Sequence, residues 1–202
     1  MALGKQAKTL TKGQVDAMLA YLSTTRHAKR NRLIFLLSVK AGLRANEIAK
    51  LTWWMTNDSE GQIGSEICLL DSASKGKSGR RIPLNEEVRK ALIEYRDEVL
   101  SKARPNDMSP AGPLVIKTER SRSTSAQAIV NMFQRWYRHL GFVGCSSHSG
   151  RRTFITNAAR KISTVGGSLK DVQELAGHAN LRTTQRYIDA NPEAQVRVVS
   201  LV

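Results

Sequence analysis

Apolar residues recur at helical spacing over most of the chain and predict a mainly helical protein. Val15, Met18, Leu19 and Leu22 form one face of a helix that begins after Thr11, whose hydroxyl suits an N-cap. The same spacing, with glycine or proline near the ends, predicts further helices over residues 32–43, 45–51, 86–103, 123–140, 148–162, 168–176 and 181–188.

The pattern changes between residues 53 and 84, where short apolar runs replace the helical spacing. Ile67 and Leu69 precede a polar turn at residues 72–79, and Ile82 and Leu84 follow it. This order predicts two paired strands. The expected fold class is therefore mainly α with a small antiparallel β-sheet (α+β). Residues 26–31 and 104–113 are expected to be connections, and residues 113–117 a short extended piece.

A chain of 202 residues suits one main domain. We expect a flexible lead-in at 1–9, the domain at 10–190 and a separate tail at 191–202. The tail from Gln195 onward is β-branched and apolar. We therefore expect it to dock, either on its own body or on a neighbouring copy of the chain.

The charge balance points to a polyanionic partner. Lys and Arg number 32 against 17 Asp and Glu, which gives a net charge of +15 and a pI near 10.3. Such a surplus favours nucleic acid over a membrane. No apolar run approaches the roughly 20 residues that span a bilayer, and there is no signal peptide. Two cysteines fit a reducing compartment, so we expect a cytoplasmic protein without a membrane partner.

The richest candidate chemistry lies near the C-terminus, where Tyr187 follows His178 by nine positions. A tyrosine is a poor nucleophile at neutral pH because its pKa is about 10, so it needs nearby cations. His148 and Arg151 stand three residues apart on one predicted helical face. Arg44 offers a guanidinium at the start of a helix.

Two further positions complete the set. Glu47 lies one turn after Arg44 and could orient nearby groups, and Lys75 or Lys77 at the polar turn could reach a leaving oxygen. Taken one at a time, these residues have ordinary explanations. An Arg–Glu pair at a helix start, a solvated turn lysine, a surface histidine beside an arginine and a core tyrosine are all common.

Together and in this order, the residues resemble the tyrosine recombinases, also called the phage integrase family. The resemblance covers about residues 10–190. It rests on Gly42-Leu-Arg44-Ala-Asn-Glu47, the turn lysine, His148-Ser-Gly-Arg151, Leu175-Ala-Gly-His178 and Tyr187. The family's lysine usually lies eight residues before a proline, here Pro83, which favours Lys75 over Lys77. Arg152 stands where the family often has histidine, and we expect it to add charge but to point elsewhere.

The resemblance implies a mechanism. Tyr187 would attack a DNA phosphorus and form a covalent 3′-phosphotyrosine, without metal, cofactor or ATP. Arg44 and Arg151 would neutralise the phosphate, and Lys75 would protonate the leaving oxygen. His148 and His178 would hydrogen-bond the phosphate or help to remove the phenol proton, with Glu47 in a supporting role.

The resemblance also implies double-stranded DNA as partner, with a homotetramer on DNA and a monomer as a possible free form. Most family members carry a DNA-grasping domain ahead of the catalytic one, so the chain would be either a naturally short member or an excised catalytic domain. The expected additional DNA contacts are Arg26, Lys29, Arg30, Lys77, Arg120, Arg122 and Arg152. Two alternatives stay open: a type IB topoisomerase and a DNA-binding regulator without catalysis. The target sequence and the outcome, whether integration, excision or inversion, also stay open.

Overall fold

The computed structural model describes residues 7–74, 78–101, 114–117, 123–188 and 199–200. The helices within these ranges are α1 (Lys12–Ser23), α2 (Ala28–Val39), α3 (Ala45–Lys50), α4 (Glu86–Ser101), α5 (Ala126–His139), α6 (Ser149–Lys161), α7 (Leu169–Ala176) and α8 (Leu181–Gln185). Short 3-10 turns lie at Trp53–Met55, Asp71–Ala73 and Ile162–Val165. The strands are β1 (Glu66–Leu69) and β2 (Arg80–Pro83), so the expected mainly helical class with a small antiparallel sheet is confirmed.

The two strands pair antiparallel with Ile67 opposite Ile82 and Leu69 opposite Arg80. Because side chains alternate across a strand, these four residues share one face of the sheet. Ile67, Leu69 and Ile82 on that face are buried in the core. Arg80 therefore points inward from the end of the hairpin, toward α3 and α7.

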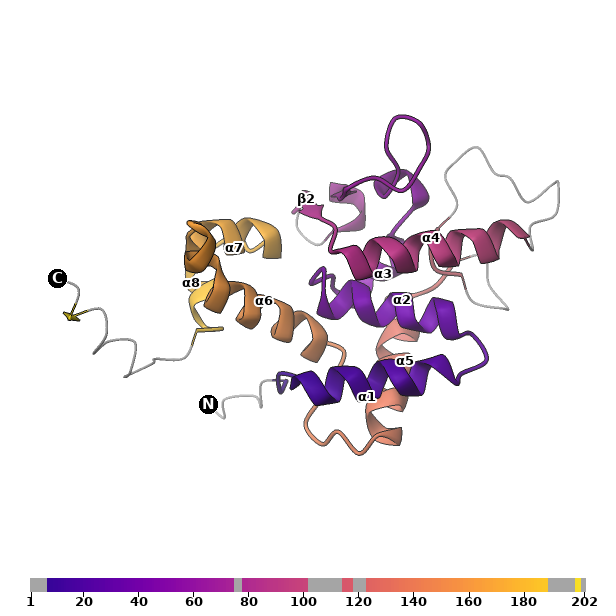
Figure 1. Cartoon of the computed structure of the whole chain (residues 1–202), viewed down its shortest axis with the longest axis horizontal. Coiled ribbons are helices and arrows are strands. Elements are labelled where there is room, and N and C mark those ends of the chain that lie inside the picture. Colours follow the sequence, from indigo (N-terminus) through magenta and orange to yellow (C-terminus); the bar gives the residue numbers. More distant parts are fainter. Residues whose placement is uncertain (1–6, 75–77, 102–113, 118–122, 189–198, 201–202) are drawn as a thin grey trace.

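Helix α2 is the centre of the main core. Leu33 to Leu37 are all fully buried, and the helix packs against α1, α4 and α6. A helix that is apolar on every side must be covered on every side. Figure 1 shows α2 between α1 and α4, with α5 behind.

Several helix ends differ from the sequence expectation. Helix α2 begins at Ala28, four residues early, because Lys29 stays exposed in its first turn while Asn31 turns inward and donates to the Thr25 hydroxyl at 3.0 Å. It ends at Val39, and Gly42 then turns the chain with φ +67°. Helix α5 begins at Ala126 because the Ser125 hydroxyl accepts from the Ala128 amide.

A second, smaller cluster lies at the C-terminal end. Its fully buried members are Ile155, Val172 and Ala176, from α6 and α7, and Tyr187 packs at its edge. Figure 1 shows α6 running from the main helical body out to α7 and α8. Helix α6 is thus the bridge between the large core and the part of the chain that holds His178 and Tyr187.

Helices α2 and α6 meet at close range. A side chain at Gly150 of α6 would collide with the Ser38 hydroxyl of α2, and one at Gly42 would collide with the Phe154 ring. The contact at Gly150 fixes the distance between α2 and α6 next to Arg151.

Some expectations fall outside the described residues. These are the whole loop at 104–113, and all of the tail at 191–202 apart from Val199 and Ser200. Within the described part of the chain, no helix has both the length and the apolar character that a membrane crossing needs.

Candidate active site at the carboxyl end of helix α7

Three arginines from three different elements donate to three successive carbonyl groups at residues 175–177. Arg80 Nε reaches the Leu175 oxygen at 2.8 Å, Arg151 Nη2 the next oxygen at 2.6 Å, and Arg44 Nη2 the Gly177 oxygen at 3.4 Å. The last carbonyls of a helix lack intrahelical partners and lie at the negative end of its dipole. The end of α7 therefore gathers cations from α3, β2 and α6.

Glu47 of α3 lies beneath two of these arginines and is fully buried. Its Oε1 accepts from Arg44 Nη1 at 2.7 Å and from Arg80 Nη1 at 3.1 Å. Its Oε2 accepts from Arg80 Nη2 at 3.1 Å and from the Arg44 amide at 2.9 Å. Burial raises the pKa of this carboxyl, but the hydrogen bonds and charges of Arg80 and Arg44 outweigh burial and hold it below the ordinary value.

Arg151 is almost completely buried, with 4% of its surface exposed. Its Nη1 donates to the Gly42 carbonyl at 2.6 Å, and its Nη2 lies 3.0 Å from His178 Nε2. Desolvation by burial, with the nearby charge of Arg44, lowers the pKa of Arg151 to about 9. The side chain nonetheless stays cationic at neutral pH, so it is a fixed positive charge in a poorly hydrated place.

The protonation state of His178 follows from its two partners. Arg151 can only donate, so His178 Nε2 must accept, and the ring proton must lie on Nδ1, which faces the Thr184 hydroxyl at 3.0 Å. Burial first, and then the charges of Arg151, Arg44 and Arg80, lower the pKa of His178 to about 4. His178 is therefore a neutral imidazole at physiological pH.

Tyr187 lies directly beside this imidazole. The two rings stack with centroids 5.6 Å apart and an interplanar angle of 23°. Tyr187 follows α8, which ends at Gln185 rather than at the expected residue 188. The tyrosine lines a pocket of about 350 Å³ whose other walls include His148, Arg151, Arg152 and Arg186.

Arg152 does not point away, and that expectation was wrong. Its guanidinium carbon lies 5.6 Å from the centroid of the Tyr187 ring, within the range of a cation–π contact. Arg152 follows Arg151 on α6, and it faces Tyr187 because the chain after α8 passes alongside that helix.

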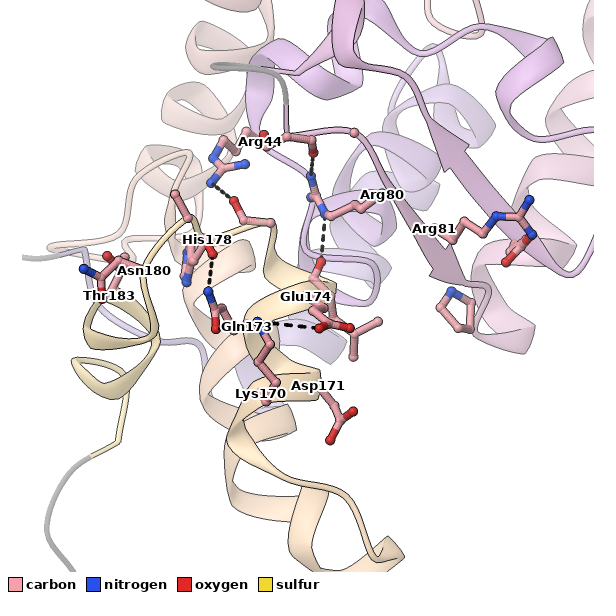
Figure 2. Close-up of a pocket in the computed structure, with 17 residues that line it drawn as sticks. Arg44, Arg80, Arg81, Lys170, Asp171, Gln173, Glu174, His178, Asn180 and Thr183 are labelled. Atoms are coloured by element: carbon pink, nitrogen blue, oxygen red, sulfur yellow. Dashed lines mark hydrogen bonds and ion pairs between the residues drawn. The ribbon is translucent and has the colours of Figure 1, made fainter.

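A larger groove of about 1130 Å³ adjoins this pocket between β2 and the α7–α8 segment. Arg44, Arg80, Gln173 and His178 line it, and Thr183 borders both hollows. Figure 2 shows Arg44 and His178 on the same side of the groove, with Arg80 reaching across from β2. The two hollows meet at Thr183 and are together called the cationic depression, although Glu66, Asp171 and Glu174 also line the larger one.

The structure brings together most of the candidate residues that it describes. Arg44 pairs with Glu47, and Arg151 contacts His178, which stacks on Tyr187. The two groups meet at the adjacent carbonyls of residues 176 and 177, and His148 lies exposed at the N-cap of α6 in the tyrosine pocket. Lys75, Lys77, Arg120 and Arg122 lie outside the described residues. Arg26, Lys29 and Arg30 lie at the opposite end of α2 from Arg44, and Arg30 donates to the Lys117 carbonyl at 3.2 Å.

Sequence reasoning missed Arg80, Gln173 and Thr184. Gln173 donates to the His178 carbonyl at 2.8 Å, and Thr184 is fully buried against the imidazole. A signal for Arg80 existed, because it stands two residues before Ile82 and must share the inward face of that strand. No comparable signal marks Gln173 or Thr184, whose contacts depend on the turn between α7 and α8.

Comparison with known proteins agrees with this arrangement. The family model described as "Phage integrase family" matches residues 8–194, which is nearly the whole chain. The chain belongs to the phage integrase family. The expected family resemblance is thereby confirmed.

Curated relatives of this integrase-family chain are named tyrosine recombinases. It is 25% identical to tyrosine recombinase XerC of Herpetosiphon aurantiacus over 94% of the chain and 58% of that protein. It is 28% identical to tyrosine recombinase XerA of Thermococcus onnurineus over 92% of the chain and 59% of that protein. The chain thus spans about three-fifths of the length of these relatives.

Solved structures of similar fold include the Tn1549 transposon integrase in complex with a circular intermediate DNA. The TM-score is 0.74 at 18% identity, covering 99% of this chain and 67% of that one. The crystal structure of XerA recombinase matches with a TM-score of 0.70 at 24% identity, covering 96% and 64%. These similarities show that the phage integrase fold extends over nearly all of this chain.

Proposed function

We propose that this chain is the catalytic part of a site-specific tyrosine recombinase that cleaves and rejoins DNA. The observation that carries the proposal is the series of contacts from Arg151 through His178 to the ring of Tyr187, beside which Arg44 donates to the Gly177 carbonyl. A phenol, two guanidiniums and an imidazole around one cationic depression suit attack on a phosphodiester. The family membership, the named recombinase relatives and the structures bound to DNA support the same reaction.

In the proposed reaction, Tyr187 Oη attacks the phosphorus, a P–O bond to tyrosine forms, and the bond to the 5′ oxygen breaks. The leaving oxygen takes a proton from Lys75, and the reverse steps with another strand rejoin the DNA. Arg44 and Arg151 balance the charge on the non-bridging oxygens, so no step calls on a metal ion. The phosphodiester energy is kept in the tyrosine ester, so no step calls on ATP.

The geometry separates the roles of the two histidines. His178 has a pKa of about 4 and its Nε2 faces a buried arginine, so it is a poor proton acceptor at neutral pH. We propose that His178 accepts a hydrogen bond from Arg151 and holds the Tyr187 ring in place by stacking. His148 is exposed in the tyrosine pocket and is the better candidate to receive the phenol proton.

The double-stranded DNA partner and the homotetramer on DNA belong to this proposal. Neither alternative function gains from the comparisons: the relatives described above are named recombinases or integrases rather than topoisomerases, and every candidate catalytic position that the structure describes is filled by a reactive side chain.

The deciding experiment is capture of the covalent intermediate. The substrate is a pool of nicked duplexes with randomised arms. After cleavage, the short fragment that carries the new 5′-hydroxyl diffuses away. The protein–DNA adduct therefore accumulates and can be sequenced. We expect an adduct with the unaltered chain and none with Tyr187→Phe, whose ring still stacks but lacks the nucleophile. Tyr21→Phe, at a tyrosine on α1, is the matched control and should leave the adduct in place. An adduct that survives Tyr187→Phe would refute the assignment.

A further inference from the structure

Arg80 is a member of the site that sequence reasoning missed, and it joins β2 to both α3 and α7. It leaves β2 with 6% of its side chain exposed. One guanidinium joins both oxygens of Glu47 on α3 and the Leu175 carbonyl at the end of α7. A planar fork with five donors can hold a carboxylate on one edge and a carbonyl on another, which a lysine cannot do.

Charge within this cluster is unevenly shared. Glu47 carries one negative charge between two cations, Arg44 and Arg80. With both arginines present the group of three has a net charge of +1, and the surplus lies at Arg44, which is 26% exposed and lines the groove. Without Arg80, Glu47 would neutralise Arg44 alone, and the exposed cation at the groove would lose its effect on an anion.

The position of Arg80 in the chain gives it a second role. It is the first residue of β2 and follows the turn that carries Lys75 by only a few residues. Its bond to Leu175 lies two residues before Gly177, where a left-handed turn with φ +61° directs the chain to His178. Figure 2 shows this bridge from the hairpin across the groove to α7.

We propose that Arg80 is a positioning residue of this active site, which offsets the charge of Glu47 so that Arg44 stays available to a phosphate and which fixes the end of α7 that presents His178. The inference rests on the proposed recombinase function for its effect on cleavage. The mechanism itself uses Arg44 and Arg151 on the phosphate, and Arg80 acts through them.

Arg81 is the matched control. It is the next residue on the same strand, but its side chain is 77% exposed and pairs with Glu66 at 2.9 Å. Figure 2 shows Arg81 directed away from Arg44 and His178. The variants Arg80→Gln and Arg81→Gln therefore remove the same charge from neighbouring positions, one inside the network and one outside it.

The test measures the single-turnover rate of adduct formation on a nicked duplex, together with the urea midpoint of each variant. We expect Arg80→Gln to slow cleavage about 10–100-fold, as is typical when the partner of a site residue is lost, and Arg81→Gln to stay within about twofold. The double variant Glu47→Gln/Arg80→Gln should cleave faster than Arg80→Gln, because no carboxylate is then left to neutralise Arg44. Equal rates for Arg80→Gln and Arg81→Gln, or no gain in the double variant, would overturn the proposal.

Two further arms keep the result decisive. If Arg80→Gln does not fold, Arg80→Lys and Arg81→Lys make the same comparison with the charge retained, and equal rates there would also overturn it. If the unaltered chain forms no adduct, the recombinase function fails, but the positioning role is still measured by NMR titration of His178. Its pKa should rise in Arg80→Gln, because a nearby cation is gone, and stay constant in Arg81→Gln; no change in either would exclude the role.

Discussion

At the scale of single residues, the site is a cluster of cations that are largely buried. Arg151 and Arg80 have lost most of their hydration, and each recovers hydrogen bonds from backbone carbonyls at the end of α7. Among the described residues, Glu47 is the one carboxylate that pairs with Arg44 and Arg80, so the cluster of these two arginines with Arg151 stays cationic. Poor hydration makes that charge act more strongly on an incoming anion than the same charge would at the surface.

The imidazole of His178 should make stability depend on pH. Its pKa is lowered from 6.5 to about 4, so between these values the unfolded chain binds the proton more readily than the folded one. The free energy of unfolding should therefore fall as the pH drops from about 6.5 to about 4. Urea unfolding across this range measures the effect.

The control for this measurement is the other histidine of the site. His178→Gln should flatten the pH dependence over that range, because the titrating group is gone. The comparison is the slope of His148→Gln, which changes an exposed side chain of the tyrosine pocket. A slope that is the same in both variants would show that other groups are responsible.

Residue identities in the site were largely predictable, because the reactive side chains have fixed spacing along the chain. Arg44, Arg151 and Tyr187 could be selected from sequence in this way. Arg152 could not be placed, because its direction depends on the path of the chain after α8, and the contacts of Thr184 with His178 depend on the same turn. Side-chain direction beyond an element's end is set by tertiary contacts that no local pattern records.

At the scale of elements, the crossing of α2 and α6 determines where Arg151 stands. The Ser38 hydroxyl of α2 is buried without a hydrogen-bond partner among the described residues, and it faces Gly150. The backbone of Gly150 lies in a regular helix, so glycine is needed there for close approach and not for an unusual backbone angle. The crossing is thus held by steric fit rather than by polar contacts at this point.

Gly150→Ala should test this fit. The added methyl group would collide with Ser38, so we expect a loss of about 1–3 kcal/mol in the free energy of unfolding. Adding Ser38→Ala should recover part of the loss, because it removes a hydroxyl that lacks a partner. Gly13→Ala is the control, because its new methyl group meets no atom within 4 Å. Equal losses at Gly150 and Gly13 would contradict a tight crossing.

Element types could be predicted more accurately than element ends. The long apolar run of α2 and the alternation around the hairpin are strong local patterns, and both elements exist. The start of α2 was misjudged because a basic stretch can be a loop or an exposed helical turn with equal ease. Only the packing of Asn31 against Thr25 distinguishes the two.

At the scale of the whole molecule, the proposed action on DNA would use positive charge beyond that of the site itself. The chain carries a net charge of +15, and the site accounts for only a few of its cations. Arg26 and Lys29 are exposed at the far end of α2, roughly 18 Å along the helix axis from its end near Arg44. This spacing would let a duplex contact both ends of the helical body, which accords with the expected phosphate track.

Salt dependence of DNA binding measures that track. Lys29→Ala should reduce the slope of log affinity against log salt by about one unit, if Lys29 contacts a phosphate. Lys90→Ala on α4 is the matched control, since Lys90 already pairs with Glu86 at 3.7 Å. Identical slopes for the two variants would remove this end of α2 from the DNA-binding surface.

Overall architecture was predictable to the level of fold class but not to the level of core division. The helical spacing gives no sign that Ile155, Val172 and Ala176 form a cluster apart from the main core. That division depends on which faces of α6 meet α2 and α7. Such three-dimensional pairing is a property of the folded chain rather than of any one segment.

The small size of that second cluster has a consequence for local opening of the fold. Three fully buried apolar residues make few contacts, so the segment that holds Tyr187 should open locally at a lower free energy than the main core requires to unfold. The arginine contacts at the end of α7 then hold this segment against α3 and β2. Amides of α7 and α8 should exchange with deuterium sooner than those of α2, while the helical body keeps its protection throughout.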